Sequence, residues 1–187
     1  MYDTIIVMGC DKTGKSTLIN NLLSVPDIKT RFSVYKGNKM SSTKAAFDAS
    51  MEVLNEHHNR SLLCDRFHFP DDMVYHPIFN TAPFPDDITQ NYMERVLPIL
   101  YKQRNTLIVY CYGNEDEVAE RFKQEGEDLV SVDNIRDIMN NYIDWLKLLY
   151  EYFPIVVLNS SYESKSDMFN KTMNAFYGNP VLGGHYK

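Results

Sequence analysis

A nine-residue stretch near the start of the chain, Gly9–Thr17, fits the pattern Gly-x-x-x-x-Gly-Lys-Ser/Thr. The apolar, β-branched run Thr4–Met8 precedes it and indicates a buried strand. Residues 17–23 follow with helical spacing of apolar side chains and contain no glycine or proline. Because a strand, a glycine-containing loop and a helix N-terminus occur in this order, the segment predicts a phosphate-binding loop.

In such a loop, free backbone N–H groups converge on an anion. Lys15 would neutralise the β- and γ-phosphates of a nucleotide, and the Ser16 hydroxyl would ligate Mg²⁺. We therefore expect ATP and Mg²⁺ to bind here. The residues predicted to contact the ATP phosphates are Gly9, Asp11, Lys12, Thr13, Gly14, Lys15, Ser16 and Thr17.

Composition narrows the class of protein further. A chain of 187 residues can form one domain with its own core, and we expect a single domain over 1–187. The three cysteines are far apart and fit no zinc-binding spacing, which is typical of a reduced cytoplasmic protein. No apolar run approaches the roughly 20 residues of a membrane span. The net charge of −6 disfavours nucleic acid as a partner, while a homodimer stays open.

Strands and helices are predicted to alternate along the chain. The expected strands are 4–8, 31–35, 61–64, 106–111 and 154–159. The expected helices are 17–23, 41–59 with Ser41 or Ser42 as its cap, 86–104, 114–124, 133–149 and 164–177. Pro98 should kink or split its helix, Gly126 should end the helix before it, and the four prolines of 68–85 predict an irregular segment.

This order predicts a three-layer α/β/α fold of the phosphate-loop type, with a five-stranded parallel sheet covered on both faces. Ligands of such folds bind at the carboxyl ends of the strands. The residues expected at that edge, besides the loop, are Lys36, Asp65, Arg66 and Tyr112.

The pair Asp65-Arg66 directly follows the third predicted strand. If that strand lies beside the first, the pair lies next to the phosphate loop. Asp65 could then hold Mg²⁺ through water or accept a proton from an attacking hydroxyl, and Arg66 could bind a phosphate through two hydrogen bonds. A solvent-facing ion pair at a strand end is the alternative.

These two motifs resemble those of the thymidylate kinases and their relatives, the deoxynucleoside kinases. Gly9–Ser16 matches the form Gly-x-Asp-basic-x-Gly-Lys-Ser, and Asp65–Phe67 matches Asp-Arg followed by Tyr, Phe or His. The resemblance implies that Asp11 faces the sugar hydroxyl of the acceptor and that Lys12 stabilises the transferring phosphoryl group. It also implies that Arg66 holds the acceptor's phosphate.

The chain departs from the family in its lid and in its acceptor segment. The lid should lie within 114–133, where Arg121 and Lys123 are the only basic residues. Either Lys12 or Arg121 could therefore supply the catalytic cation. Phe47 is the candidate for stacking on the acceptor base, and core packing is its alternative role. The aromatic residues of 67–92 could likewise form a wall for the base or ordinary core.

The function expected from these residues is ATP-dependent phosphorylation of a nucleoside monophosphate, such as dTMP, in nucleotide biosynthesis. Such an acceptor needs a cation beyond the donor site, which Arg66 with Lys36 or Arg31 could supply. The alternatives are a deoxynucleoside kinase with Asp65 as the base, a kinase acting on a modified base or an end in DNA, and a non-enzymatic nucleotide-binding switch. The expected catalytic residues are Lys12, Lys15, Asp65 and Arg66; the acceptor-binding residues are Asp11, Lys36, Phe47 and Arg66; the lid residues are Arg121 and Lys123; the Mg²⁺ ligands are Ser16 and Asp65.

Overall fold

The computed structural model describes residues 2–80, 82–124 and 131–178. Its strands are β1 (Thr4–Gly9), β2 (Phe32–Lys36), β3 (Ser61–Asp65), β4 (Thr106–Tyr112) and β5 (Ile155–Asn159). Its helices are α1 (Lys15–Leu23), α2 (Pro26–Arg31), α3 (Thr43–Glu56), α4 (His68–Phe79), α5 (Asp86–Asn91), α6 (Glu115–Gln124), α7 (Val132–Leu149) and α8 (Lys165–Phe176). Two π-helical turns, Tyr92–Val96 and Ile99–Gln103, continue α5.

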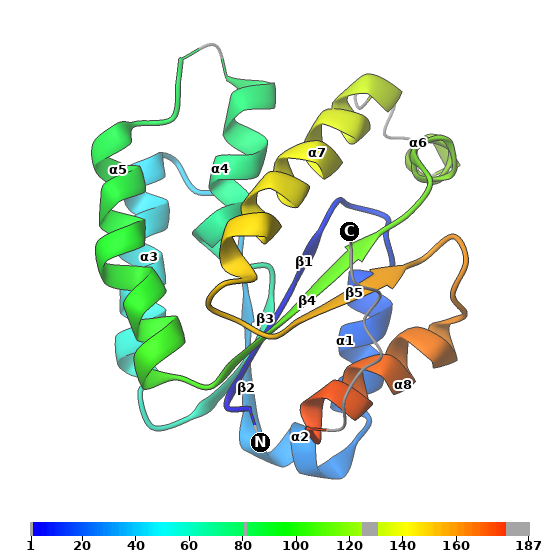
Figure 1. The fold of residues 1–187 in the computed structure, drawn as a ribbon, viewed down its shortest axis with the longest axis horizontal. Coiled ribbons are helices and arrows are strands. Elements are labelled where there is room, and N and C mark those ends of the chain that lie inside the picture. The colour runs from blue at the N-terminus through cyan, green and yellow to red at the C-terminus, as the bar shows by residue number, and fades with distance from the viewer. Residues whose placement is uncertain (1, 81, 125–130, 179–187) are drawn as a thin grey trace.

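The five strands form one parallel sheet, as the sequence predicts, and their order is β2-β3-β1-β4-β5 (Figure 1). The strand β1 lies at the centre and pairs with β3 on one side and β4 on the other. All six of its residues are buried, which its apolar composition allows because helices cover both faces of the sheet. The loop after β1 therefore begins between the carboxyl ends of β3 and β4.

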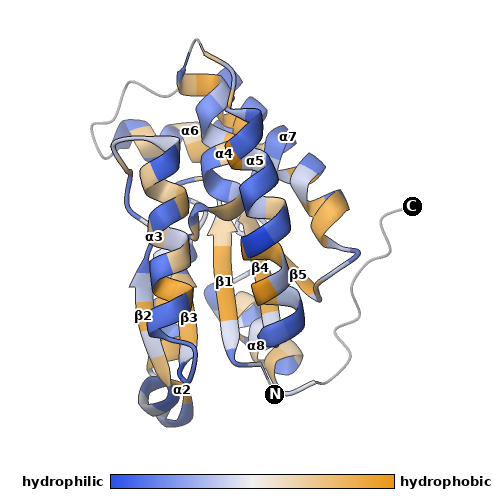
Figure 2. Ribbon diagram, turned by 90° about the vertical axis from the view of Figure 1, so that its left-hand side faces the viewer, coloured by the Kyte–Doolittle hydropathy of each residue, from blue (hydrophilic) through white to orange (hydrophobic). Residues whose placement is uncertain are grey.

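Two apolar clusters fill the layers on either side of the sheet. One face of the strands packs against α1, α2 and α8, and the other packs against the layer of α3, α4, α5 and α7 (Figure 1). Successive residues of β1 alternate between the two clusters, with Ile5 and Val7 in one and Ile6 and Met8 in the other. The strands β1 and β4 are apolar in Figure 2, whereas the surrounding helices carry hydrophilic outer faces.

Several helix boundaries agree with the sequence. Ser42 caps α3, since its hydroxyl accepts a hydrogen bond from the Ala45 N–H at 3.1 Å. Ser164 and Asp167 form a reciprocal capping box at the start of α8. The expected end of α6 at Gly126 lies outside the described residues.

One prediction about local structure was wrong, and one helix was not predicted. The segment 68–85 was expected to be irregular, yet α4 occupies most of it: Pro70 stands in the first turn of its regular part, where no backbone N–H is needed. The short helix α2 was missed, although Pro26 begins it. Pro98 was expected to kink or split its helix. Its own backbone is helical, but π-helical turns flank it on both sides and interrupt the regular α-helix.

Gly9 joins β1 to the phosphate loop at a point where no side chain fits. Its φ is 133°, and a Cβ atom there would lie 1.9 Å from the carbonyl oxygen of Cys111 on β4. The two residues are register partners in the sheet. The central strand can therefore reach the loop only with glycine at this position.

We expect Gly9→Ala to lower the free energy of unfolding by about 3 kcal/mol, through a backbone clash added to an unfavourable φ. Gly178→Ala is the matched control, because Gly178 also has a positive φ of 75° but a Cβ atom there would meet nothing within 4 Å. The control should lose only about 1 kcal/mol. Urea denaturation of both variants tests the prediction, and equal losses would contradict it.

Candidate functional site

The phosphate loop is held by its own backbone and by buried side chains. Lys12 and Gly14 have positive φ angles of 63° and 89°. The Thr13 hydroxyl donates a hydrogen bond to the carbonyl oxygen of Cys10 at 2.7 Å. Gly14 is the N-cap of α1, so the free N–H groups of the helix's first turn belong to the loop. This arrangement can bind a phosphate group through backbone donors.

Lys15, the first residue of α1, folds its side chain back onto the loop. It is only 5% exposed, and its Nζ donates to the Cys10 carbonyl oxygen at 2.5 Å. The same nitrogen lies 3.7 Å from Asp11 Oδ1. Burial lowers the pKa of Lys15, and the nearby positive charge of Arg66 lowers it further. The loop thus holds a buried ammonium group whose partners a phosphate could replace.

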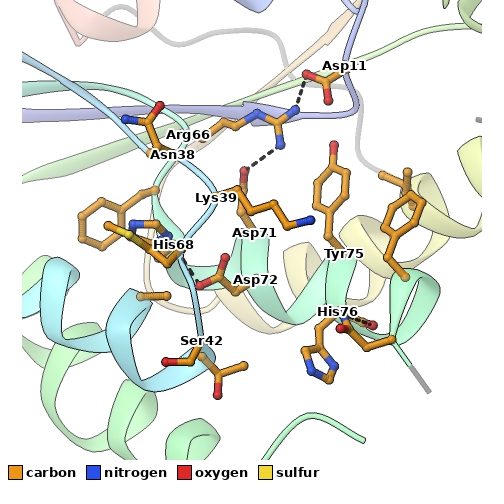
Figure 3. A pocket seen from close by; sticks show the side chains of 18 of the residues that line it. Asp11, Asn38, Lys39, Ser42, Arg66, His68, Asp71, Asp72, Tyr75 and His76 are labelled. Carbon is orange, nitrogen blue, oxygen red and sulfur yellow. Dashed lines mark hydrogen bonds and ion pairs between the residues drawn. The ribbon is translucent and has the colours of Figure 1, made fainter. Parts of the chain in front are cut away.

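The Arg66 guanidinium lies between two carboxylates from different parts of the chain (Figure 3). It forms an ion pair with Asp11 of the phosphate loop, and its Nη1 lies 3.6 Å from Asp71 Oδ2 on α4. Its carbon Cζ is 5.0 Å from the centre of the Tyr75 ring. Burial alone would raise the pKa of Asp11, but Lys15 and Arg66 outweigh it and hold that pKa below its usual value. These contacts join the loop, the end of β3 and α4.

Asp71 is the buried member of this group. Its side chain is 8% exposed, and burial raises its pKa to about 6 against the opposing effect of Arg66 and Lys15. A carboxylate in so apolar a setting persists only beside a positive charge. Asp71 therefore fixes Arg66 from the side of α4.

A cavity of about 580 Å³ opens beside Arg66, at the carboxyl ends of β1 and β3. A volume of this size suits a nucleotide. Much of its wall comes from α4, and the loop after β2 covers the opposite side. The polar residues that line it include Asp11, Lys39, Ser42, Arg66, Asp72 and Tyr75.

A second cavity, of about 350 Å³, lies on the other side of the phosphate loop. Its lining includes Lys12, Gly14, Thr17, Arg121 and Ser160. Since Asp11 lines the first cavity and Lys12 the second, the loop separates the two. One nucleotide in each cavity would therefore have its phosphates at the loop.

Arg121 connects α6 to this loop. Its Nη1 donates to the Lys12 carbonyl oxygen at 3.0 Å and to Ser160 Oγ at 3.2 Å. The Lys12 Nζ lies 5.5 Å from the centre of the Phe122 ring, which is the next residue of α6. Arg121 thus holds the backbone of Lys12, and the two candidate cations belong to one network of contacts.

Of the remaining predicted site residues, some lie beside the phosphate loop and others lie away from both cavities. Ser16 is exposed in the first turn of α1, and Asp65 is half-buried at the end of β3, opposite Val7 of β1. Lys36 and Lys123 are exposed and line neither cavity. Arg31 stands at the opposite end of β2 and pairs with Asp27.

Phe47 does not line the first cavity. It is 5% exposed and packs in the core, with its ring centre 5.4 Å from that of Tyr92. The structure thus assigns it the core role rather than the stacking role. Phe79 and Tyr75, by contrast, line the cavity with their rings stacked at 6.2 Å.

Sequence reasoning missed Lys39, Asp71 and Asp72, whereas Tyr75 and Phe79 belong to the aromatic residues of 67–92 that it named as a possible wall for the base. The signal lay in the four-residue spacing of Asp71, Tyr75 and Phe79, which places them on one helical face. The prolines of 68–85 hid that spacing, since the segment was taken as irregular. Lys39 lies in a loop and has no periodic signal.

Comparison with known proteins adds a structural likeness. No protein-family profile matches the chain, and no curated protein matches its sequence. Among solved structures, the YorR protein from Bacillus subtilis, in complex with phosphorylated GDP, gives a TM-score of 0.70 over 93% of this chain and 95% of its own. The fold is that of the P-loop nucleotide kinases.

Two further structures extend this likeness. Deoxyadenosine kinase from M. mycoides with bound dATP gives a TM-score of 0.68 over 93% of this chain and 99% of its own, and thymidylate kinase from Candida albicans gives 0.62 over 94% and 91%. Sequence identity is 16% for YorR, 16% for the deoxyadenosine kinase and 13% for the thymidylate kinase. At this identity the likeness concerns the fold alone.

The described structure contains no candidate metal cage. Within residues 2–80, 82–124 and 131–178, no three His, Cys, Asp or Glu side chains are grouped to hold an ion. In the same ranges no helix has the length and apolar character needed to cross a membrane.

The contact between Arg121 and Lys12 allows the roles of the two cations to be tested separately. We expect Lys12→Ala to lower kcat by about a hundredfold with little change in the KM for ATP, because its charge acts mainly in the transition state. Arg121→Ala should have a smaller effect, acting through the backbone of Lys12. The double variant should then resemble Lys12→Ala alone, since residues in one network are not additive.

Steady-state kinetics of the three variants provide the measurement, with the exposed Lys123→Ala as the control. A larger loss in Arg121→Ala than in Lys12→Ala would reverse the two roles.

Proposed function

We propose that the protein transfers the γ-phosphoryl group of ATP to a nucleoside monophosphate, and that the acceptor is a deoxynucleotide such as dTMP. The observation that carries this proposal is the position of Arg66. Its guanidinium lies between the phosphate loop and a cavity large enough for a nucleotide. An acceptor phosphate bound at Arg66 would lie next to the γ-phosphoryl group that it receives from ATP.

Lys39 supplies the further cation that a monophosphate requires. It lines the same cavity as Arg66 and enters it from the loop after β2 (Figure 3). The sequence alone suggests Lys36 or Arg31 for this role. Lys39 is the better candidate, because neither of the other two lines the cavity.

On the donor side, the loop N–H groups, Lys15 and Lys12 would bind the ATP phosphates. Phosphoryl transfer needs charge neutralisation and in-line positioning more than covalent chemistry. Lys15 would exchange its contacts with Cys10 and Asp11 for phosphate oxygens. Asp11, freed in part, would face the sugar of the acceptor.

Mg²⁺ is expected beside this loop. Ser16 offers a hydroxyl and Asp65 a carboxylate, and oxygen ligands of this kind, completed by water, are what Mg²⁺ prefers. When bound, the ion would neutralise charge on the β- and γ-phosphates.

A deoxynucleoside kinase is the second candidate. The observation in its favour is that Asp11 and Asp71 already balance the charge of Arg66. An uncharged hydroxyl would leave this balance intact, and Asp65 would act as its base. The monophosphate is preferred because Lys39 adds a positive charge that a nucleoside would not need.

The release of ADP from ATP with a panel of nucleosides and their monophosphates tests the proposal. We expect turnover with monophosphates. Lys39→Ala should raise their KM by about tenfold, the loss of one charged contact. Lys36→Ala is the matched control and should leave KM unchanged, because Lys36 is exposed and outside the cavity. Turnover with nucleosides alone would refute the proposal.

A further inference from the structure

Polar side chains of α4 line the first cavity, the one beside Arg66 in which the proposed acceptor would bind. His68, Asp72 and His76 follow one another at four-residue intervals, and all three line the cavity. Asp11 and Arg66 lie at one end of the cavity in Figure 3, and Ser42 and His76 lie at the other, with Asp72 between. An acceptor with its phosphate at Arg66 would therefore extend its base along this row.

Asp72 lies against His68, four residues earlier in the chain. Its Oδ2 lies 3.4 Å from His68 Nδ1, and the His68 side chain is 3% exposed. The Asp72 side chain keeps 26% exposure. Because Asp72 lines the cavity and its side chain is partly exposed, its carboxylate can contact a ligand there.

The His68 ring supplies a second observation. Its Nε2 is buried and has no hydrogen-bond partner within the described residues, although His68 lines the cavity. Buried polar atoms of this kind are normally paired. The other ring nitrogen, Nδ1, is the one that faces Asp72, so the ring borders the cavity beside this carboxylate.

An ionised carboxylate accepts hydrogen bonds and donates none. It pairs well with an exocyclic amino group, as on cytosine, adenine or guanine. Thymine offers a single N–H between two carbonyl oxygens, and these oxygens would face the carboxylate with repulsion. Asp72 is thus matched to an amino-bearing base and mismatched to thymine.

We propose that Asp72, positioned by His68, determines the acceptor base and selects bases with an exocyclic amino group over thymine. This inference rests on the proposed function for the placement of the acceptor. It keeps the acceptor a deoxynucleoside monophosphate but replaces dTMP, the example named under the proposed function, by dCMP, dAMP or dGMP.

The test compares kcat/KM for dCMP, dAMP, dGMP and dTMP in the wild type, Asp72→Asn and Asp137→Asn. The wild type should favour each amino-bearing nucleotide over dTMP by about tenfold or more, the value of one good base contact. Asp72→Asn should remove most of that ratio, because an amide can also donate to a thymine carbonyl. The control removes an exposed carboxylate of α7 and should leave the ratio unchanged.

Two kinetic outcomes would overturn the inference. One is a wild type that prefers dTMP. The other is an Asp72→Asn variant that lowers all four kcat/KM values alike, which a merely structural role would produce.

Calorimetric binding of the four deoxynucleosides and their monophosphates separates this inference from the proposed function. If nucleosides alone accept the phosphoryl group but cytosine, adenine and guanine still bind better than thymine, the proposed function fails and the role of Asp72 stands. If monophosphates are phosphorylated without a base preference, the proposed function stands and the role of Asp72 fails.

Discussion

The ion pair between Asp11 and Arg66 is the contact on which the candidate site depends. It joins the phosphate loop after β1 to the residue that follows β3, and Asp71 extends it to α4. Charges of opposite sign therefore alternate from Lys15 through Asp11 and Arg66 to Asp71. Because partly buried charges are stable only when paired, this chain of charges fixes the relative positions of three segments that are distant in sequence.

The order of the strands makes this pairing geometrically available. Since β3 lies directly beside β1, with Val7 opposite Asp65, the residue after β3 reaches the loop without any long connection. The Arg66 N–H donates to the Val7 carbonyl oxygen at 2.9 Å and so continues the sheet by one hydrogen bond. Its φ of 64° then departs from strand geometry. The sheet thus delivers the side chain to the boundary between the two cavities.

The sequence predicted the sheet, the phosphate loop and the place of Asp65-Arg66, because each depends on local pattern: β-branched runs, fixed glycines and strand ends. It did not predict α4, since prolines are read as breakers unless their place in a helix turn is known. The cavity-lining residues Lys39 and Asp72 were missed for a different reason. Their roles depend on which segments the fold brings together, and Phe47 shows the converse, an aromatic residue that the fold buries away from the cavity.

In the proposed function, two nucleotides bind on opposite sides of the phosphate loop and their phosphates meet there. Two compounds test this arrangement directly. In each, adenosine is joined 5′ to 5′ through five phosphates to a second nucleoside, deoxycytidine in one and thymidine in the other. We expect the better of the two compounds to bind at least about a hundredfold more tightly than ATP in calorimetry, because one molecule fills both cavities. Affinity no greater than that of ATP for both compounds would contradict it.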